Sequence, residues 1–277
     1  MPFTEIRLTL RETSIAVAPG RGAHVTGLTV DGRDLLYLDR GTFDDPAKNV
    51  RGGIPVLFPF AGRLAGDRFI PAGTTIPQHG FGRNRAWKVT GQDGRSVVLA
   101  LEPDADAKAV YPYDFRAEQT FRIVPRGLLV ELRIRNRGAV PLPVAPGWHP
   151  YFRCPAARKP EIAGSVPGLA PEKFPNEKEF DFGLPAPTAG AATFQIPDLG
   201  SLALSWSPDL HHLQFWSPAG KDFVCIEPFT GPADAVNRPD QRVEIPPGSA
   251  RLFWMRIELR PDAPGTGAGS QGLEVRS

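Results

Sequence analysis

Proline and glycine occur at short intervals along the whole chain, and this frequency of helix- and strand-breaking residues constrains the fold more than any other feature. The sequence holds 31 prolines and 29 glycines among 277 residues, against a usual combined share of roughly 12%. Because they are spread throughout and not gathered in one linker, they leave only short stretches between them. Such spacing disfavours long helices and a doubly wound sheet.

The stretches between these breakers alternate apolar and polar residues with the period of a β-strand. Eight of them are rich in Val, Ile, Leu, Phe or Trp, namely 3–10, 23–30, 117–124, 128–136, 201–207, 213–217, 222–227 and 251–260. No window of 12 residues has helical periodicity, and residues 104–110 suit a single turn at most. The sequence therefore predicts an all-β, antiparallel sandwich or barrel.

No composition shift divides this series of strands. We therefore expect one domain over residues 1–260, followed by a flexible tail over residues 261–277 that is rich in Gly and Pro and too poor in apolar residues to pack.

Bulk composition argues against several classes of function. The formal charge of +2 with no long basic run argues against nucleic-acid binding. No apolar run reaches the roughly 20 residues of a spanning helix, and the N-terminus lacks a signal peptide's apolar segment. Cys154 and Cys225 are too few for a disulfide framework or a zinc cluster. We expect buried thiols, a cytoplasmic protein and no membrane partner.

Chemistry in a sandwich without nucleotide-binding motifs must come from side chains. His79 and His149 stand among glycines, prolines and aromatics, in "HGFGRNRAW" and "GWHPYF". Glu227 ends the apolar strand "DFVCIE", where an acid sheltered by its neighbours gains proton affinity and suits a general base. Each group also has a purely structural interpretation, and two His with one carboxylate form a common metal-ligand set.

The other three histidines, His24, His211 and His212, are interpreted as structural or exposed, because they lie in a plain alternating strand or directly after a turn.

Four segments together resemble one family, the aldose 1-epimerases of the galactose mutarotase-like superfamily. They are "GGIPVLFPFAGRL", "HGFGRNRAW", "GWHPYF" and "CIEPFTGPADAVNRP", in that order. The resemblance implies a single-domain antiparallel β-supersandwich and ring opening of a hexose without cofactor or metal. It gives Glu227 the role of base and His149 that of the acid at the ring oxygen, and it makes His79 a support for the developing charge.

The same resemblance implies that Arg63, Gln214 and Trp216 contact the sugar. Gly62 stands where the family often has an asparagine, so one polar contact is lost or replaced. A second departure from the family pattern concerns an aspartate that the family uses for substrate binding. No acidic residue stands at the expected place, and Asp181 and Asp198 are the nearest.

Evidence on phosphate is divided. Arg51 and Arg83 match the hexose-6-phosphate 1-epimerase branch, where such arginines lie near the phosphate, whereas "PADAVNRP" resembles the free-sugar branch. Arg85 either joins them or is a solvated loop charge.

The leading interpretation is a mutarotase for a free hexose, acting as a monomer or weak homodimer on a small-molecule sugar. The alternatives are a hexose-6-phosphate 1-epimerase, a non-catalytic carbohydrate-binding protein and a metal-dependent isomerase.

Overall fold

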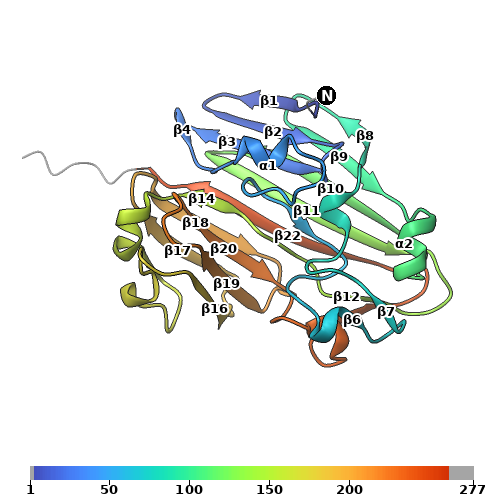
Figure 1. Cartoon of the computed structure of the whole chain (residues 1–277). Helices are drawn as coiled ribbons and strands as arrows, with labels where there is room; N and C mark the ends of the chain where they lie inside the picture. The colour runs from blue at the N-terminus through green and yellow to red at the C-terminus, as the bar shows by residue number, and fades with distance from the viewer. Residues whose placement is uncertain (1–2, 262–277) are drawn as a thin grey trace, which may run out of the picture.

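A computed structural model describes residues 3–261, and it consists mainly of antiparallel strands (Figure 1). Strands make up 46% and helices 11%. The helical segments are short: α1 (Arg40–Phe43), α2 (Ala105–Val110), and 3₁₀ turns at Ala65–Asp67, Gly82–Asn84, Ala156–Glu161, Pro171–Lys173 and Ala235–Asn237. The prediction of an all-β fold with helix confined to short turns is confirmed. The tail predicted for 261–277 lies outside the described residues, apart from Pro261.

The largest sheet has eight strands in the order β15-β17-β18-β22-β11-β10-β9-β8. Their bounds are β8 (Lys88–Gln92), β9 (Ser96–Leu101), β10 (Phe115–Val124), β11 (Gly127–Asn136), β15 (Ala163–Gly164), β17 (Ala191–Ile196), β18 (Gly200–Trp206) and β22 (Ala250–Leu259). The hairpin of β10 and β11 closes at Val124 and Gly127, with Arg126 in the left-handed conformation (φ 54°) between them. Strict alternation buries every second residue of β10.

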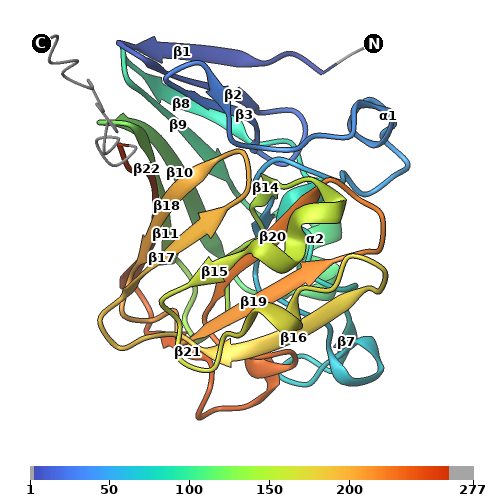
Figure 2. The same cartoon turned by 90° about the vertical axis from the view of Figure 1, so that its left-hand side faces the viewer.

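A second sheet of six strands carries the functional face. The strand order is β16-β19-β20-β13-β5, and β14 also pairs with β20. The bounds are β5 (Val56–Leu57), β13 (Gly147–Trp148), β14 (Tyr151–Arg153), β16 (Phe180–Pro185), β19 (His212–Ser217) and β20 (Phe223–Phe229). One face contributes Leu213 and Phe215 to the main hydrophobic core. Phe215 meets Phe194 of the eight-stranded sheet at 6.1 Å between ring centroids, so these two sheets form the sandwich layers seen in Figure 2.

The N-terminal strands form a third sheet at the top of Figure 1, drawn in blue. It comprises β1 (Ile6–Leu10), β2 (Thr13–Ala18), β3 (His24–Val30) and β4 (Arg33–Asp34). Two small hairpin sheets complete the fold, β6 (Arg68–Phe69) with β7 (Thr74–Thr75), and β12 (Leu142–Val144) with β21 (Val243–Ile245). One continuous core extends from Leu8 in β1 to Leu259 in β22, so the third sheet shares the core of the sandwich.

All eight predicted strands are present, with ends displaced by a few residues, and residues 104–110 form α2. Cys154 and Cys225 are free and buried, as predicted. Within residues 3–261, no helix is long and apolar enough to cross a membrane.

Candidate active site

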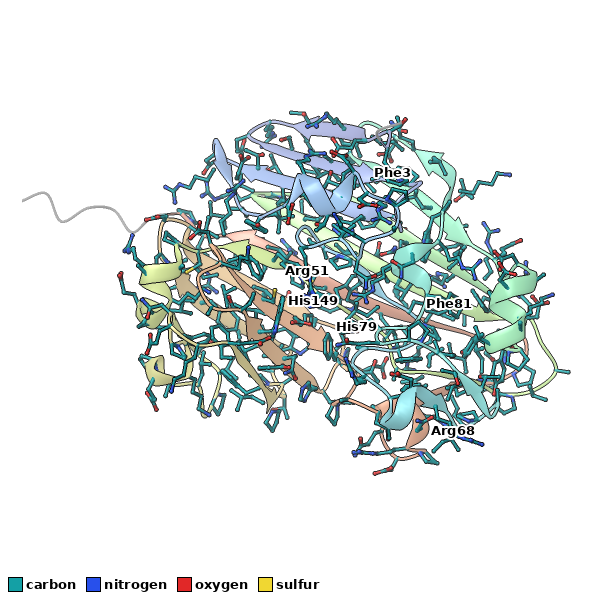
Figure 3. All side chains as sticks on the ribbon, viewed as in Figure 1. Phe3, Arg51, Arg68, His79, Phe81 and His149 are labelled. Carbon is teal, nitrogen blue, oxygen red and sulfur yellow. The ribbon has the colours of Figure 1, made fainter. Side chains whose placement is uncertain are left out.

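A pocket of about 530 Å³ opens on the outer face of the six-stranded sheet, opposite the core. Strand alternation builds its floor, because residues two apart point to the same side. On β20 these are Glu227 and Phe229, and on β19 they are Gln214 and Trp216. The pocket gathers all eight residues singled out in the sequence: Arg51, Arg63, His79, Arg83, His149, Gln214, Trp216 and Glu227. Arg51, His149 and His79 are labelled near the centre of Figure 3.

Glu227 is a carboxyl group at the floor of the pocket with only 1% of its surface exposed. Its Oε1 atom lies 3.5 Å from His149 Nε2 and has no hydrogen-bond partner within residues 3–261. Burial raises the pKa of Glu227 well above 4.5, and the negative charge of Asp181 adds to this, while Arg83 opposes it. A carboxyl with a raised pKa is a stronger base than an exposed one, which suits it to proton transfer.

His149 lies between β13 and β14, with its ring packed among aromatic side chains. Tyr151 stacks on it at 4.6 Å between centroids and 9° between planes, and Trp216 meets it edge-on at 5.7 Å. Burial lowers the pKa of His149 well below 6.5, and His79, Arg83 and Arg51 lower it further. In the unliganded pocket the imidazole is therefore neutral.

His79 is held by a reciprocal pair of hydrogen bonds with Gly62. The backbone N–H of His79 donates to the Gly62 carbonyl at 2.8 Å, and the Gly62 N–H donates to His79 Nδ1 at 3.0 Å. Because Nδ1 accepts, the neutral ring carries its hydrogen on Nε2. Burial, with Arg83, Arg51 and Arg63 nearby, lowers the pKa of His79 well below 6.5. The residue holds a left-handed backbone (φ 68°), which few side chains adopt.

Three arginines line the pocket. Arg51 places its guanidinium over the Trp216 ring at 5.3 Å. The Nε atom of Arg83 is buried and has no partner in the described part of the chain, while its Nη2 donates to the Gln78 carbonyl at 3.2 Å. Arg63 is the third. The buried, unpaired Nε of Arg83, together with the exposed Arg51 and Arg63, suits an anionic or strongly polar ligand group.

Arg85 does not join them. Its Nη1 donates to Asp104 at 2.5 Å, and it stands outside the residues that line the pocket. Of the two sequence interpretations, the loop charge is the one that the structure supports.

Two acidic residues of the pocket lining were missed as site residues. Asp181 Oδ1 accepts from Gln214 Nε2 at 2.5 Å, and Glu179 Oε1 accepts from Trp216 Nε1 at 2.8 Å. Asp181 was noted as one of the two aspartates nearest to the expected position, and it lines the pocket. The other, Asp198, pairs with Arg158 at 2.5 Å and does not.

The segment "GPADAVNRP" positions a loop. Asn237 Oδ1 accepts from the backbone N–H of Ile70, and its Nδ2 donates to the carbonyl of Arg68, both at 2.8 Å. Asp234 Oδ1 accepts from the backbone N–H of Ala65 at 3.1 Å. These bonds fix the chain that immediately follows Arg63.

His24 acts in the same way on the segment that carries Arg51. It is buried, its Nε2 lies 2.7 Å from the Gly52 carbonyl oxygen, and burial lowers its pKa to about 4. Its structural interpretation is confirmed.

One group of side chains at the pocket floor could hold a metal ion. His149, Cys225 and Glu227 offer one ligand atom each, all within 4.8 Å of one another. This mixed set of nitrogen, sulfur and oxygen suits Zn²⁺. Two features oppose a cation there: burial raises the pKa of the Cys225 thiol well above 9, and the arginines add positive charge.

The fold and this pocket together define a β-supersandwich with a buried pair, Glu227 and His149, at the floor of a polar cleft. A family model described as aldose 1-epimerase matches residues 5–168. The Slr1438 protein of Synechocystis sp. PCC 6803 is 32% identical, with 92% of this chain and 95% of that chain covered and a TM-score of 0.85. The chain belongs to the aldose 1-epimerase family.

Two further proteins are similar to this chain. The structure of a "galactose mutarotase related enzyme" from Lactobacillus acidophilus has a TM-score of 0.76 at 16% identity, covering 93% of this chain and 98% of that one, and shows the fold alone. A protein of Escherichia coli K12 named "Putative glucose-6-phosphate 1-epimerase" is 28% identical over 152 residues. That match spans 52% of this chain and 47% of the relative.

Proposed function

We propose that this protein is an aldose 1-epimerase that interconverts the α and β anomers of a hexose by acid–base ring opening. The observation that carries the proposal is the buried pair at the pocket floor. Glu227 Oε1 and His149 Nε2 are 3.5 Å apart, and Glu227 Oε1 has no hydrogen-bond partner among the described residues. The hydroxyl oxygen on C1 and the ring oxygen are bonded to the same carbon, so a closely spaced pair can serve both.

The reaction moves two protons and breaks one carbon–oxygen bond. Glu227 takes the proton from the C1 hydroxyl, His149 gives a proton to the ring oxygen, and the C1–O5 bond breaks to leave an open-chain aldehyde. Rotation about C1–C2 presents the other face of the aldehyde. Closure then returns one proton from Glu227 to the C1 oxygen and the other from the C5 hydroxyl to His149. The hexose and both side chains end with their original protons.

The pair carries one proton throughout this cycle. Before ring opening the proton is on His149 with Glu227 ionised, and while the sugar is open it is on Glu227 with His149 neutral. Burial raises the pKa of Glu227 and lowers that of His149, so the pocket favours the second distribution. The resting pair is in that second distribution, so the proton must pass from Glu227 to His149 before ring opening, and its return to Glu227 favours the open-chain stage.

His79 supplies a neutral hydrogen-bond donor. The Gly62 N–H occupies its Nδ1 atom, so its Nε2 hydrogen is available to the reacting oxygens. The ring centroids of His79 and His149 are 5.7 Å apart. A fixed donor stabilises charge that develops on oxygen without changing its own protonation state.

The rest of the lining suits a polyol. Trp216 offers a flat apolar face for C–H groups, while Gln214, Asp181 and Glu179 offer polar groups to hydroxyls.

A second candidate is the same reaction on a hexose 6-phosphate. It is favoured by Arg51, Arg63 and Arg83 in the pocket lining and by the unpaired, buried Nε of Arg83. A dianionic phosphate accepts several guanidinium donors at once.

Polarimetry tests both candidates. We expect the protein to accelerate equilibration of pure α-glucose, α-galactose or glucose 6-phosphate in proportion to its concentration. Under the phosphate candidate, Arg83→Gln lowers kcat/KM for glucose 6-phosphate at least tenfold more than for glucose, and salt weakens the preference. Arg85→Gln is the matched control, because Arg85 stands outside the pocket lining. Acceleration of none of the sugars, despite measurable binding, would identify a non-catalytic carbohydrate-binding protein instead.

A further inference from the structure

His212 lies next to the pocket without lining it, and it contacts Gln214, which does line it. The Nε2 atom of His212 is 2.9 Å from Gln214 Oε1, and Gln214 Nε2 donates to Asp181 Oδ1 at 2.5 Å. A carboxylate only accepts hydrogen bonds, so the amide nitrogen of Gln214 faces Asp181 and its oxygen faces His212. His212 must then carry its hydrogen on Nε2. The chain of bonds runs His212 to Gln214 to Asp181.

Gly183 provides the room for this arrangement. It is the β16 residue paired with Gln214 in the sheet. A Cβ atom at that position would lie 2.1 Å from His212 Cε1, 2.4 Å from His212 Nε2 and 3.0 Å from Gln214 Oε1. The imidazole therefore occupies the space that any other residue at 183 would need. Phe229 holds the opposite side of the ring, stacked at 6.2 Å and 22°.

A side-chain amide that has only one anchor can turn over and exchange its donor for its acceptor. Asp181 fixes one end of Gln214, but Asp181 is exposed at the pocket rim and is itself free to accept from a ligand. The hydrogen bond from His212 is the second anchor. It keeps the second hydrogen of Gln214 Nε2 available beside the Asp181 carboxylate, so a donor and an acceptor stand next to each other.

We propose that His212 is a positioning residue that determines sugar specificity by fixing the amide of Gln214 beside Asp181. The proposal rests on the proposed sugar-binding function of this pocket. The donor–acceptor pair suits two neighbouring hydroxyls, one accepting from Gln214 and the other donating to Asp181. An epimer with one of those hydroxyls inverted loses one of the two bonds, so the fixed amide distinguishes epimers.

The first test uses His212→Phe, which keeps a ring against Phe229 but removes the N–H donor. We expect the dissociation constant of the tightest-binding sugar among glucose, galactose, mannose and glucose 6-phosphate to rise about tenfold, the scale for one lost hydrogen bond to a positioned group. We expect the ratios between the dissociation constants of the other three sugars and that of the tightest-binding sugar to fall by a similar factor, while kcat stays within about threefold of the wild-type value. Titration calorimetry gives these constants whether or not the protein interconverts the anomers, so failure of the epimerase proposal does not disturb the test.

Two further variants separate positioning from general damage. Gly183→Ala places a methyl group where the imidazole lies, and it should reproduce the loss of discrimination without adding to it in the double variant with His212→Phe. His212→Gln restores an N–H donor and should recover part of the discrimination. His211→Phe is the matched control, because the neighbouring His211 is exposed and bonds through its backbone.

A ligand-free measurement completes the test. Long-range ¹H–¹⁵N correlation spectra should show His212 as the Nε2–H tautomer between about pH 6.5 and 9. The Nδ1–H tautomer would overturn the proposal. So would a folded His212→Phe variant with affinities and epimer ratios within twofold of the wild type, or a wild-type protein that binds none of the four sugars.

Discussion

Replacing Glu227 by glutamine removes the proton-accepting carboxylate from the pocket floor while keeping the shape of the side chain. General acid–base groups contribute roughly 10²–10⁴-fold to a rate. At about 1.36 kcal/mol per decade this corresponds to a barrier increase of about 2.7–5.4 kcal/mol. Because Glu227 is 1% exposed and lies 3.5 Å from His149, water cannot readily substitute for it. We expect kcat/KM for anomerisation to fall by that factor while the dissociation constant of the sugar changes only a few-fold.

The same substitution has a predictable effect on stability. Burial raises the pKa of Glu227 in the folded protein. The carboxyl therefore contributes its full stability to the fold below the unfolded pKa of about 4.5, where it is protonated in both states. That contribution is lost as the pH rises through the folded pKa. Glutamine has no such dependence. The Tm of Glu227→Gln relative to the wild type should therefore increase from pH 4 to pH 8.

Polarimetry and thermal unfolding measure both effects on the same samples. Glu131→Gln serves as the matched control, since Glu131 lies on β11 of the eight-stranded sheet, away from the pocket lining. A Glu227→Gln protein that equilibrates the anomers within threefold of the wild-type rate would refute the acid–base assignment. A relative Tm that falls between pH 4 and pH 8 would refute the account of its burial.

Three further predictions concern the same pocket. The pH profile of kcat/KM should be bell-shaped, because Glu227 and His149 together must hold one proton. The acid limb follows the pKa of His149, which is below 6.5, and the alkaline limb follows the pKa of Glu227, which is above 4.5. A rate independent of pH from 3 to 10 would contradict this prediction. His79→Gln keeps an acceptor for Gly62 and should lower kcat about tenfold to a hundredfold, less than Glu227→Gln does, in the same polarimetric assay. Asn237→Ala releases the chain after Arg63 and should raise KM about tenfold with kcat within threefold, whereas an unchanged KM would show that the loop needs no such anchor.

Sequence patterns predicted the strands that bury one face on the core. Residues 117–124 alternate strictly in burial within β10, and residues 251–259 lie within β22, where burial alternates from Leu252 onward. β16 was missed because Phe180–Pro185 contains Gly183 and ends in proline, which is typical of a loop. Its strand conformation comes from tertiary packing, since Phe182 stacks on Phe215 at 5.2 Å and the strand pairs with β19.

In the candidate site too, local sequence identified the residues that stand in motifs but not those placed by contacts between distant segments. The four motifs contain His79, His149, Glu227 and two of the pocket arginines, Arg63 and Arg83, so local sequence was enough to identify these residues. Glu179 carries no local signal, because it reaches the pocket through the Trp216 side chain. The sequence led to His212 being interpreted as structural or exposed. Its contact with Gln214 could not be predicted, because it depends on the space left by Gly183 in another strand. Arg85 differs from Arg83 only in the direction that the loop gives its side chain.

The central claim is that the C1–O5 bond breaks and the C1–O1 bond stays intact. Glucose labelled with ¹³C and ¹⁸O at C1 tests it directly, because the isotope shift in ¹³C spectra reports the label while the same spectra report the anomers. Glucose 6-phosphate labelled in the same way covers the second candidate. Ring opening predicts that the anomers equilibrate with protein many times faster than ¹⁸O is lost to water. Loss of one ¹⁸O for each inversion would show displacement at C1 by water and would contradict the account.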